Sequence, residues 1–185
     1  MKSKVTRIGA LLLLLWASAA SARDWKVDAA HSTLTFTGTY QGEKFEGRFK
    51  RFDARIAYDP ANLAQSKFDV DIDIASVDTA NTERDQALPG KPFFDTAQFP
   101  RAHFVTTRFR KAADGRVFAD GTLSLRGVSK PVTLAVTFAQ AGNGGTLDVQ
   151  TTLKRLDFGI GSGDWADTSM IGNAVMVRGH LLLQP

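Results

Sequence analysis

Regular alternation of apolar and polar residues limits the fold of this chain more than any other feature. In the segment SKFDVDIDIAS the apolar members are Phe68, Val70, Ile72 and Ile74, with lysine and aspartate residues among them. Successive side chains of an extended strand point to opposite faces, so this spacing predicts a strand with one buried and one wet face. The same period recurs in STLTFTGTY, KFEGRFKRFDARIAYD and PVTLAVTF, and more weakly in TLDVQTTL and residues 174–183.

Turn-forming residues separate these segments. Aspartate, proline, asparagine and glycine gather in YDPANL, ADGRV and AGNGG, as β-turns require. A series of about eight strands at hairpin spacing predicts an all-β protein, either an antiparallel sandwich or a barrel. One segment, Thr79–Leu88, has polar starters, good helix formers and a proline directly after it, which predicts a single short helix.

The first 22 residues have the pattern of a cleaved signal peptide. Lys2, Lys4 and Arg7 precede a leucine-rich run at 8–17, and small residues follow at 20–22. The apolar run is shorter than the roughly 20 residues that a membrane-spanning helix needs. We therefore expect an exported protein with residues 23–185 as one mature domain.

Composition excludes several classes of function. Three of the 23 lysines and arginines lie in the predicted signal peptide, which leaves 20 basic residues against 19 acidic ones. This balance, without a basic cluster interleaved with aromatic residues, argues against nucleic-acid binding. The absence of cysteine excludes disulfides, thiolate metal sites and cysteine nucleophiles.

Catalytic and metal-binding motifs are weak in this sequence. Asp28, His31 and Ser32 are the residue types of a hydrolase triad, but they lie within five residues and no GxSxG motif is present. A turn-capping aspartate beside a hydrogen-bonded His–Ser pair is the expected arrangement. His103 and His180 lack zinc-binding spacing, and the aspartates of DVDID alternate on one strand instead of forming a calcium loop. We therefore predict a binding protein, not an enzyme, with no catalytic residues, metal or cofactor.

The segment Leu88–Phe104 holds four phenylalanines and three prolines, so it is neither one helix nor one central strand. It forms a long excursion from a tightly connected sheet. Small barrels have an interior that side chains fill or that holds one small ligand. Phe93, Phe94 and Phe99 therefore act either as a lid over a ligand or as a plug of ordinary core packing. The glycine-rich segment GIGSGDWADTSMIGN is interpreted as a loop across one barrel end, with three candidate plugs: Trp165, Met170 and Ile171.

Five segments in this order resemble the YceI family: WKVDAAHSTLTF, DIASVDTANTERDQAL, FFDTAQFPRAHF, ADGTLSLRGVSKPVTLAVTF and IGNAVMVRGHLLL. The resemblance implies an extended, lipocalin-like antiparallel β-barrel of eight strands around an apolar tunnel. It also implies binding of a polyisoprenoid chain, such as an isoprenoid quinone or its precursor, in the bacterial periplasm. Asn173 stands where the family often has an acidic residue, which weakens any role for a charge at that position.

The inward members of the alternating strands, together with the phenylalanines of the loop, are the candidate ligand contacts. They are Phe36, Phe45, Phe49, Phe68, Val70, Ile72, Ile74, Phe93, Phe94, Phe99, Phe104, Leu134, Val136 and Phe138. The expected partners are a polyisoprenoid or quinone lipid, a transient contact with a membrane and a second copy of the chain in a homodimer. Two alternatives to a lipid carrier stay open: an accessory protein of a membrane redox enzyme, and an enzyme acting on an amphiphile through Asp28, His31 or Asp95.

Overall fold

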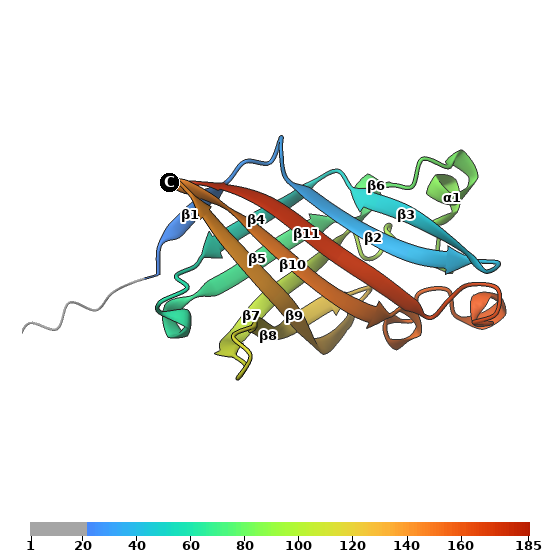
Figure 1. Cartoon of the computed structure of the whole chain (residues 1–185). Coiled ribbons are helices and arrows are strands. Elements are labelled where there is room, and N and C mark those ends of the chain that lie inside the picture. Colours follow the sequence, from blue (N-terminus) through green and yellow to red (C-terminus); the bar gives the residue numbers. More distant parts are fainter. Residues whose placement is uncertain (1–21) are drawn as a thin grey trace, which may run out of the picture.

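The computed structural model describes residues 22–185, which form a barrel built almost entirely from β-strands (Figure 1). The predicted signal peptide, residues 1–22, lies outside the described residues apart from Ala22. The elements are β1 (Asp24–Val27), β2 (Thr33–Tyr40), β3 (Glu43–Phe49), β4 (Phe52–Ala57), β5 (Lys67–Asp73), β6 (Val77–Asp78), α1 (Thr82–Ala87), β7 (Arg101–Lys111), β8 (Val117–Leu125), β9 (Val128–Ala141), β10 (Gly144–Lys154) and β11 (Ala174–Gln184). Short 3₁₀ turns occur at Leu63–Gln65, Ile74–Ser76, Arg155–Phe158 and Gly163–Trp165.

The strands close into one antiparallel barrel. Hydrogen-bonded neighbours follow the order β1-β4-β5-β7-β8-β9-β10-β11, and β11 pairs with β1 to complete the ring. β2 continues along β11 beyond β1, β3 pairs with β2, and β6 pairs with β3. The pairs β1/β2, β3/β4 and β5/β6 are therefore three interrupted strands, and together with β7–β11 they make a barrel wall of eight strands. The predicted eight-stranded antiparallel barrel with one short helix is confirmed.

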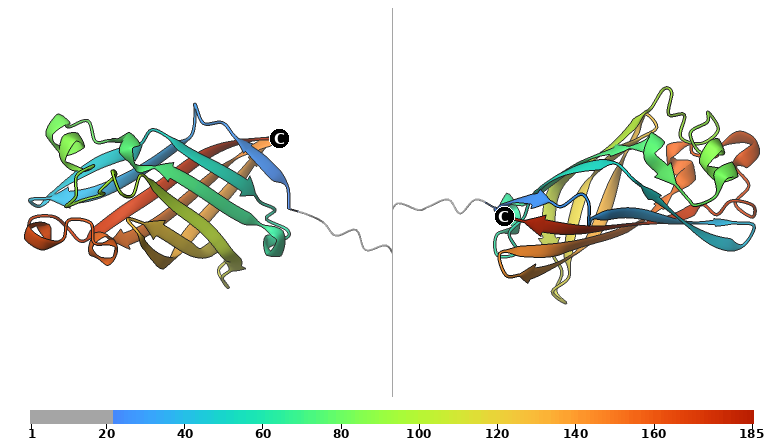
Figure 2. Two further views of the ribbon diagram at one scale, coloured as in Figure 1. Left: turned by 180° about the vertical axis from the view of Figure 1, so that it is seen from behind. Right: turned by 90° about the horizontal axis from the view of Figure 1, so that it is seen from above.

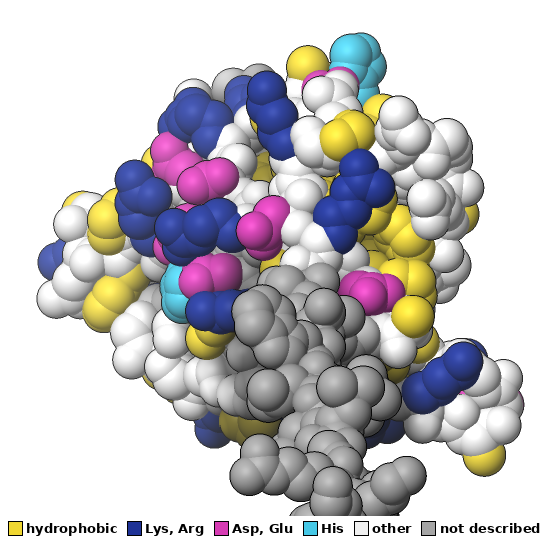
Figure 3. All heavy atoms as spheres, turned by 90° about the vertical axis from the view of Figure 1, so that its left-hand side faces the viewer, with side chains coloured by type: hydrophobic (Ala, Val, Ile, Leu, Met, Phe, Trp, Pro, Cys, Tyr) yellow, Lys and Arg dark blue, Asp and Glu magenta, His cyan; other side chains and the backbone are white. Residues whose placement is uncertain are grey.

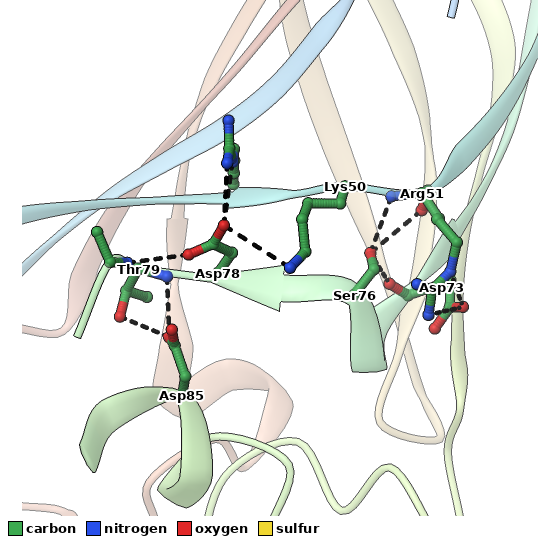
Figure 4. A network of polar contacts seen from close by, with 9 residues as sticks. Lys50, Arg51, Asp73, Ser76, Asp78, Thr79 and Asp85 are labelled. Atoms are coloured by element: carbon green, nitrogen blue, oxygen red, sulfur yellow. Dashed lines mark hydrogen bonds and ion pairs between the residues drawn. The ribbon is translucent and has the colours of Figure 1, made fainter. Parts of the chain in front are cut away.

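Polar contacts satisfy the backbone where two of these strands are interrupted (Figure 4). Ser76 Oγ accepts a hydrogen bond from Arg51 N at 3.0 Å and donates one to Asp73 O at 2.6 Å. The carbonyl oxygen of Ser76 accepts from Lys50 N at 3.1 Å. An ion pair of 2.8 Å joins the side chains of Arg51 and Asp73. Because Ser76 is buried, the peptide groups freed by the two breaks find partners without water.

The α-helix α1, the one found within residues 22–185, is shorter than the predicted segment Thr79–Leu88. Asn81 is the N-cap residue, and its Oδ1 accepts a hydrogen bond from Arg84 N at 2.9 Å. Thr79 stays outside the helix and donates from N and Oγ1 to Asp85 Oδ1, at 2.8 and 2.7 Å, which fastens α1 to the end of β6 (Figure 4). Among residues 22–185, no helix has the length and apolar character needed to cross a membrane.

One half of the barrel interior is filled by aromatic rings. The ring centroid of Tyr58 lies 5.3 Å from that of Phe138, 5.8 Å from Phe68 and 5.9 Å from Phe109. Trp25 packs against Phe138 at 5.5 Å and donates from Nε1 to the carbonyl oxygen of Tyr58 at 2.9 Å. This half lies toward the end where β1 pairs with the last residues of β11, which we call the closed end.

Three segments gather at the opposite end of the barrel, which we call the mouth (Figures 1 and 2). They are α1 with the loop at 88–100, the hairpin between β2 and β3, and the segment 155–173 between β10 and β11. Residues 88–100 form a loop, as the prolines of the segment Leu88–Phe104 predicted, and Phe104 lies on β7. The termini of the described chain lie at the closed end, so the barrel has two ends of different structure (Figure 1).

Candidate functional site

The half of the barrel nearer the mouth encloses a cavity of about 400 Å³. Side chains of β2–β5, of β7–β11 and of α1 line it, and nearly all of them are aliphatic or aromatic. Sites for small molecules typically have volumes of about 300–1,000 Å³ with apolar walls and a few polar groups. The cavity therefore has the size and the chemistry of a site for an apolar ligand.

Most of the candidate ligand contacts from the sequence line this cavity. They are Phe36, Phe45, Phe49, Val70, Ile72, Ile74, Phe93, Phe94, Phe104 and Leu134. The structure thus brings together strand residues and two phenylalanines of the loop 88–100 around one space. Their contact with a ligand stays a prediction.

Four candidates lie outside the cavity lining. Phe68, Val136 and Phe138 belong to the packed core of the closed end. Phe99 packs against the turn between β8 and β9, where a Cβ built on Gly127 would lie 2.7 Å from its ring. Alternation assigns a side chain to the barrel interior but does not give its depth along the barrel axis, so these residues were indistinguishable from cavity residues in the sequence.

Several lining residues were not among the candidates. Val149 and Leu153 on β10 and Val175 and Val177 on β11 form much of one wall. The alternation in TLDVQTTL and in residues 174–183 was the signal that could have identified them. Arg155 also lines the cavity, and no sequence pattern could have identified it, because a single arginine after a strand has no characteristic spacing.

Aromatic rings from β2, β3 and the loop 88–100 form one side of the cavity. The centroid of Phe36 lies 6.3 Å from Phe45 and 5.4 Å from Phe49, and Phe49 lies 6.2 Å from Phe94. Gly38 makes room for this cluster, since a Cβ there would lie 2.8 Å from the Phe45 ring. These contacts make an apolar surface that is continuous from the strands to the loop.

The mouth has a charged and an apolar side. On α1, the guanidinium carbon of Arg84 lies 4.0 Å from the ring centroid of Phe45, a cation–π contact at the edge of the cavity. On the apolar side, the ring centroids of Phe93 and Trp165 lie 5.5 Å apart. This contact joins the loop 88–100 to the segment 155–173. Trp165 is 41 % exposed, so it borders the opening and does not fill the barrel as a plug.

Arg155 organises the segment between β10 and β11. Its side chain is 5 % exposed, and it donates hydrogen bonds to backbone carbonyl oxygens only. The acceptors and their distances are Ile160 (2.9 Å), Gly161 (2.5 Å), Trp165 (2.9 Å), Ile171 (2.8 Å) and Gly172 (3.2 Å). Burial lowers the pKa of this guanidinium. No ion pair within residues 22–185 includes Arg155, and the dipoles of these carbonyl groups stabilise its charge.

Asp28, His31 and Ser32, the residue types of a hydrolase triad, lie outside the cavity lining and make structural contacts. Asp28 accepts hydrogen bonds from Ala30 N at 3.2 Å and lies 3.0 Å from His31 Nδ1, a contact that lowers the pKa of the Asp28 carboxyl. Ser32 Oγ accepts from Leu182 N at 3.0 Å and so joins the break between β1 and β2 to β11. Asp28 thus caps the turn as expected, whereas the partner of His31 is Asp28 and the partner of Ser32 is the backbone of β11.

The aspartates of DVDID line the outer face of β5. Asp69, Asp71 and His103 lie close enough together to share a cation. However, the guanidinium of Arg55 already lies 2.8 Å from Asp69 and 3.6 Å from Asp71, and His103 Nδ1 lies 3.0 Å from Asp71. The hydrogen bond from Arg55 lowers the pKa of Asp69. The cluster is therefore an ion-pair network on the barrel wall.

A closed antiparallel barrel with one packed half and one hollow apolar half defines a small barrel protein with an internal binding cavity. The family model of the YceI-like domain matches residues 25–182, and the chain belongs to this family. The resemblance noted in the sequence is thereby confirmed.

Known proteins are similar to this chain in sequence, in fold or in both. A UPF0312 protein of Vibrio vulnificus is 35 % identical over 145 residues, which is 77 % of each chain. The crystal structure of BcnA from Burkholderia cenocepacia matches with a TM-score of 0.81 at 34 % identity, over 85 % of this chain and 99 % of that one. A polyisoprenoid binding domain from Saccharophagus degradans, implicated in plant cell wall breakdown, matches with a TM-score of 0.66 at 19 % identity, over 86 % and 97 % of the two chains. The last of these supports the fold alone.

Proposed function

We propose that the protein binds a polyisoprenoid lipid, such as an isoprenoid quinone or its precursor, and carries it in the periplasm without converting it. The observation that carries this proposal is the apolar cavity of about 400 Å³ that opens at one end of the barrel. The charged start, leucine-rich run and small residues of positions 1–22 support export to the periplasm.

The distribution of polar groups sets the direction of the ligand. Asn81, Glu83 and Arg84, on and before α1, are polar residues that line the cavity at the mouth, whereas the closed end is filled by the aromatic core. A prenyl tail would point toward the packed core, and its head group would stay at the mouth. The same opening then serves for entry and release.

Membership of the YceI family and the shared fold with a domain described as polyisoprenoid binding support a lipid ligand. A branched, unsaturated hydrocarbon chain suits walls made of phenylalanine, leucine, isoleucine and valine. Such walls offer dispersion contacts and no groups that demand hydrogen bonds.

Energetics favours exchange with a membrane. Moving a methylene group from water to an apolar site gains about 0.8 kcal/mol. A prenyl lipid in a bilayer is already in hydrocarbon, however, so the cavity gains only from shape and from head-group contacts. Transfer close to thermoneutral is what a carrier needs, and it requires no reaction.

The proposal is tested by filling the cavity. Val177 lines the cavity from β11, and the adjacent Met176 faces the outside of the same strand. The wild-type protein, Val177→Trp and the matched control Met176→Trp are each purified from a bacterial periplasm, and bound lipid is extracted and identified by mass spectrometry. We expect a prenyl lipid near one per chain in the wild type and in Met176→Trp, and a loss of most of it in Val177→Trp.

The outcomes separate the alternatives. A quinone in the extract would favour the role of an accessory to a membrane redox enzyme within the same binding function. Equal lipid content in Val177→Trp and Met176→Trp would show that the lipid binds elsewhere. A wild-type protein that carries no prenyl lipid and takes up none when it is added would refute the proposal.

A further inference from the structure

We propose that the mouth docks on the surface of a phospholipid bilayer through an apolar rim formed by Tyr40, Trp165 and Met170. This inference rests on the proposed lipid-binding function and names the surface from which the cargo enters. The docked rim would join the cavity to the hydrocarbon of the bilayer.

The exposure of large apolar side chains is confined to this rim. Among residues 22–185, the exposed large apolar side chains are Tyr40 (39 %), Trp165 (41 %) and Met170 (41 %). All three belong to two of the three segments at the mouth: Tyr40 ends β2, and the other two lie between β10 and β11. Their position at one end, instead of scattered over the wall, indicates a contact surface.

Backbone hydrogen bonds make the rim one unit. Gln41 N donates to Met170 O at 2.7 Å, and Gly172 N donates to Thr39 O at 2.9 Å. Tyr40 and Ile171 form an antiparallel bridge between these two contacts. The segment that holds Trp165 and Met170 is therefore fixed to the β2–β3 hairpin, so the three residues belong to one connected part of the mouth.

The rim continues into the cavity. Tyr40 and Trp165 both line the cavity and are both partly exposed, so each reaches from the interior to the outer surface. A prenyl chain leaving the cavity would pass these side chains. Unless the rim is covered by another apolar phase, that chain enters water, where each methylene costs about 0.8 kcal/mol.

The chemistry of the rim fits a bilayer. Tyrosine and tryptophan concentrate at membrane–water interfaces because an apolar ring and a polar group sit in one side chain. Asp164 and Asp167 flank Trp165, and Asp167 Oδ1 accepts from Ser169 N at 2.8 Å to shape the turn before Met170. Because these carboxylates must stay hydrated, they would remain at the level of the head groups while the apolar side chains of the rim enter the interface, and this contact needs no anionic lipid. The closed end, in contrast, presents basic and acidic side chains side by side (Figure 3).

The test compares two glutamate substitutions. Met170 is exposed and outside the cavity lining, so Met170→Glu places a charge in the rim without altering the ligand site. Leu182→Glu places the same charge on the outer face of β11 near the closed end, next to Leu183, which pairs with β1. Binding to phosphatidylcholine vesicles is measured by co-sedimentation and by the blue shift of Trp165 fluorescence. Binding of a fluorescent prenyl alcohol is measured separately in detergent.

We expect Met170→Glu to weaken vesicle binding by about tenfold or more, since a buried charge opposes insertion, and to leave prenyl-alcohol binding unchanged. Leu182→Glu should match the wild type in both assays, and 0.5 M salt should not release the wild type. A wild type that binds prenyl alcohol but not vesicles, or an equal loss in both variants, would overturn the docking surface. Vesicle binding that depends on Met170 without any prenyl-alcohol binding would refute the proposed function and leave the docking surface supported.

Discussion

Replacing Arg155 by methionine removes a buried cation that is hydrogen-bonded to backbone carbonyl groups. The five acceptors span residues 160–172, so this one side chain holds both ends of the segment that borders the mouth. Methionine keeps much of the side-chain volume but donates no hydrogen bond. The carbonyl oxygens then lose their partner, and the segment is expected to open to water.

The magnitude follows from two opposing contributions. Hydrogen bonds from a charged donor contribute about 1.5–3 kcal/mol each, and burying the guanidinium costs several kcal/mol. Each buried carbonyl oxygen that loses its donor costs about 1–3 kcal/mol, and the relieved desolvation of the guanidinium offsets part of the sum over five acceptors, so we expect a net loss of several kcal/mol for closure of this segment. If the segment and the barrel unfold together, the melting temperature falls by about 2–4 °C per kcal/mol in a domain of this size. Arg155→Lys keeps the positive charge but has only three N–H donors, so its stability should lie between those of the wild type and Arg155→Met.

Hydrogen–deuterium exchange distinguishes local opening from global destabilisation. In Arg155→Met, amides of residues 160–172 should exchange at least tenfold faster, and the bond from Gly161 N to Pro92 O (2.7 Å) should carry the effect into the loop 88–100. Amides of β7 should exchange more slowly than those of residues 160–172 and of the loop 88–100, and their exchange should report the free energy of global unfolding. Unchanged exchange at residues 160–172, together with an unchanged melting temperature, would refute the assigned role of Arg155.

Two further changes test the barrel wall. Hydrogen bonds from Thr133 and Arg110 hold the pKa of Asp120 at about 2, below its usual 3.8, so it contributes stability above about pH 4 that is lost as the pH falls through 2. In Asp120→Asn the free energy of unfolding should be lower at neutral pH and should change less between about pH 4 and 2; denaturant titrations at both pH values check this, and a parallel pH profile would contradict it. Gly127 has φ of +72° and faces the ring of Phe99, so Gly127→Ala should lower the free energy of unfolding by about 1–3 kcal/mol; an unchanged denaturation midpoint would show that the turn relaxes without strain.

Alternation predicted an all-β sandwich or barrel because it reports directly on which face of a strand is buried, and the resemblance to the YceI family implied the barrel. Phe36, Val70 and Leu134 were placed inside the barrel by this pattern alone, and they line the cavity. The same pattern contains no information on depth, since Phe68 and Phe104 alternate in the same way but lie in different cores. Depth depends on how each strand is staggered against its neighbours, which only the pairing register defines.

Local irregularities were the second limit. A register shift between Thr106 and Arg108 moves the inward positions of β7 from even to odd numbers and turns Phe109 into the aromatic core. The break at Lys50 and Arg51 has the same effect between β3 and β4. Such shifts depend on tertiary hydrogen bonds like those of Ser76, and the hydrophobic period of a single strand does not predict where they occur.

The pairing of β1 with the end of β11 places both termini of the described chain opposite the mouth (Figure 1). A strand of 11 residues such as β11 is about 36 Å long at roughly 3.3 Å per residue. A protein tethered to a surface through either terminus would thus hold its opening a few nanometres away from that surface and facing outward. For an immobilised sample this is an advantage, because cargo and vesicles reach the opening unobstructed. For a lipid carrier this arrangement separates the end that would be tethered from the end at which lipid would be exchanged. A barrel tethered to one membrane would therefore direct its opening toward a second one.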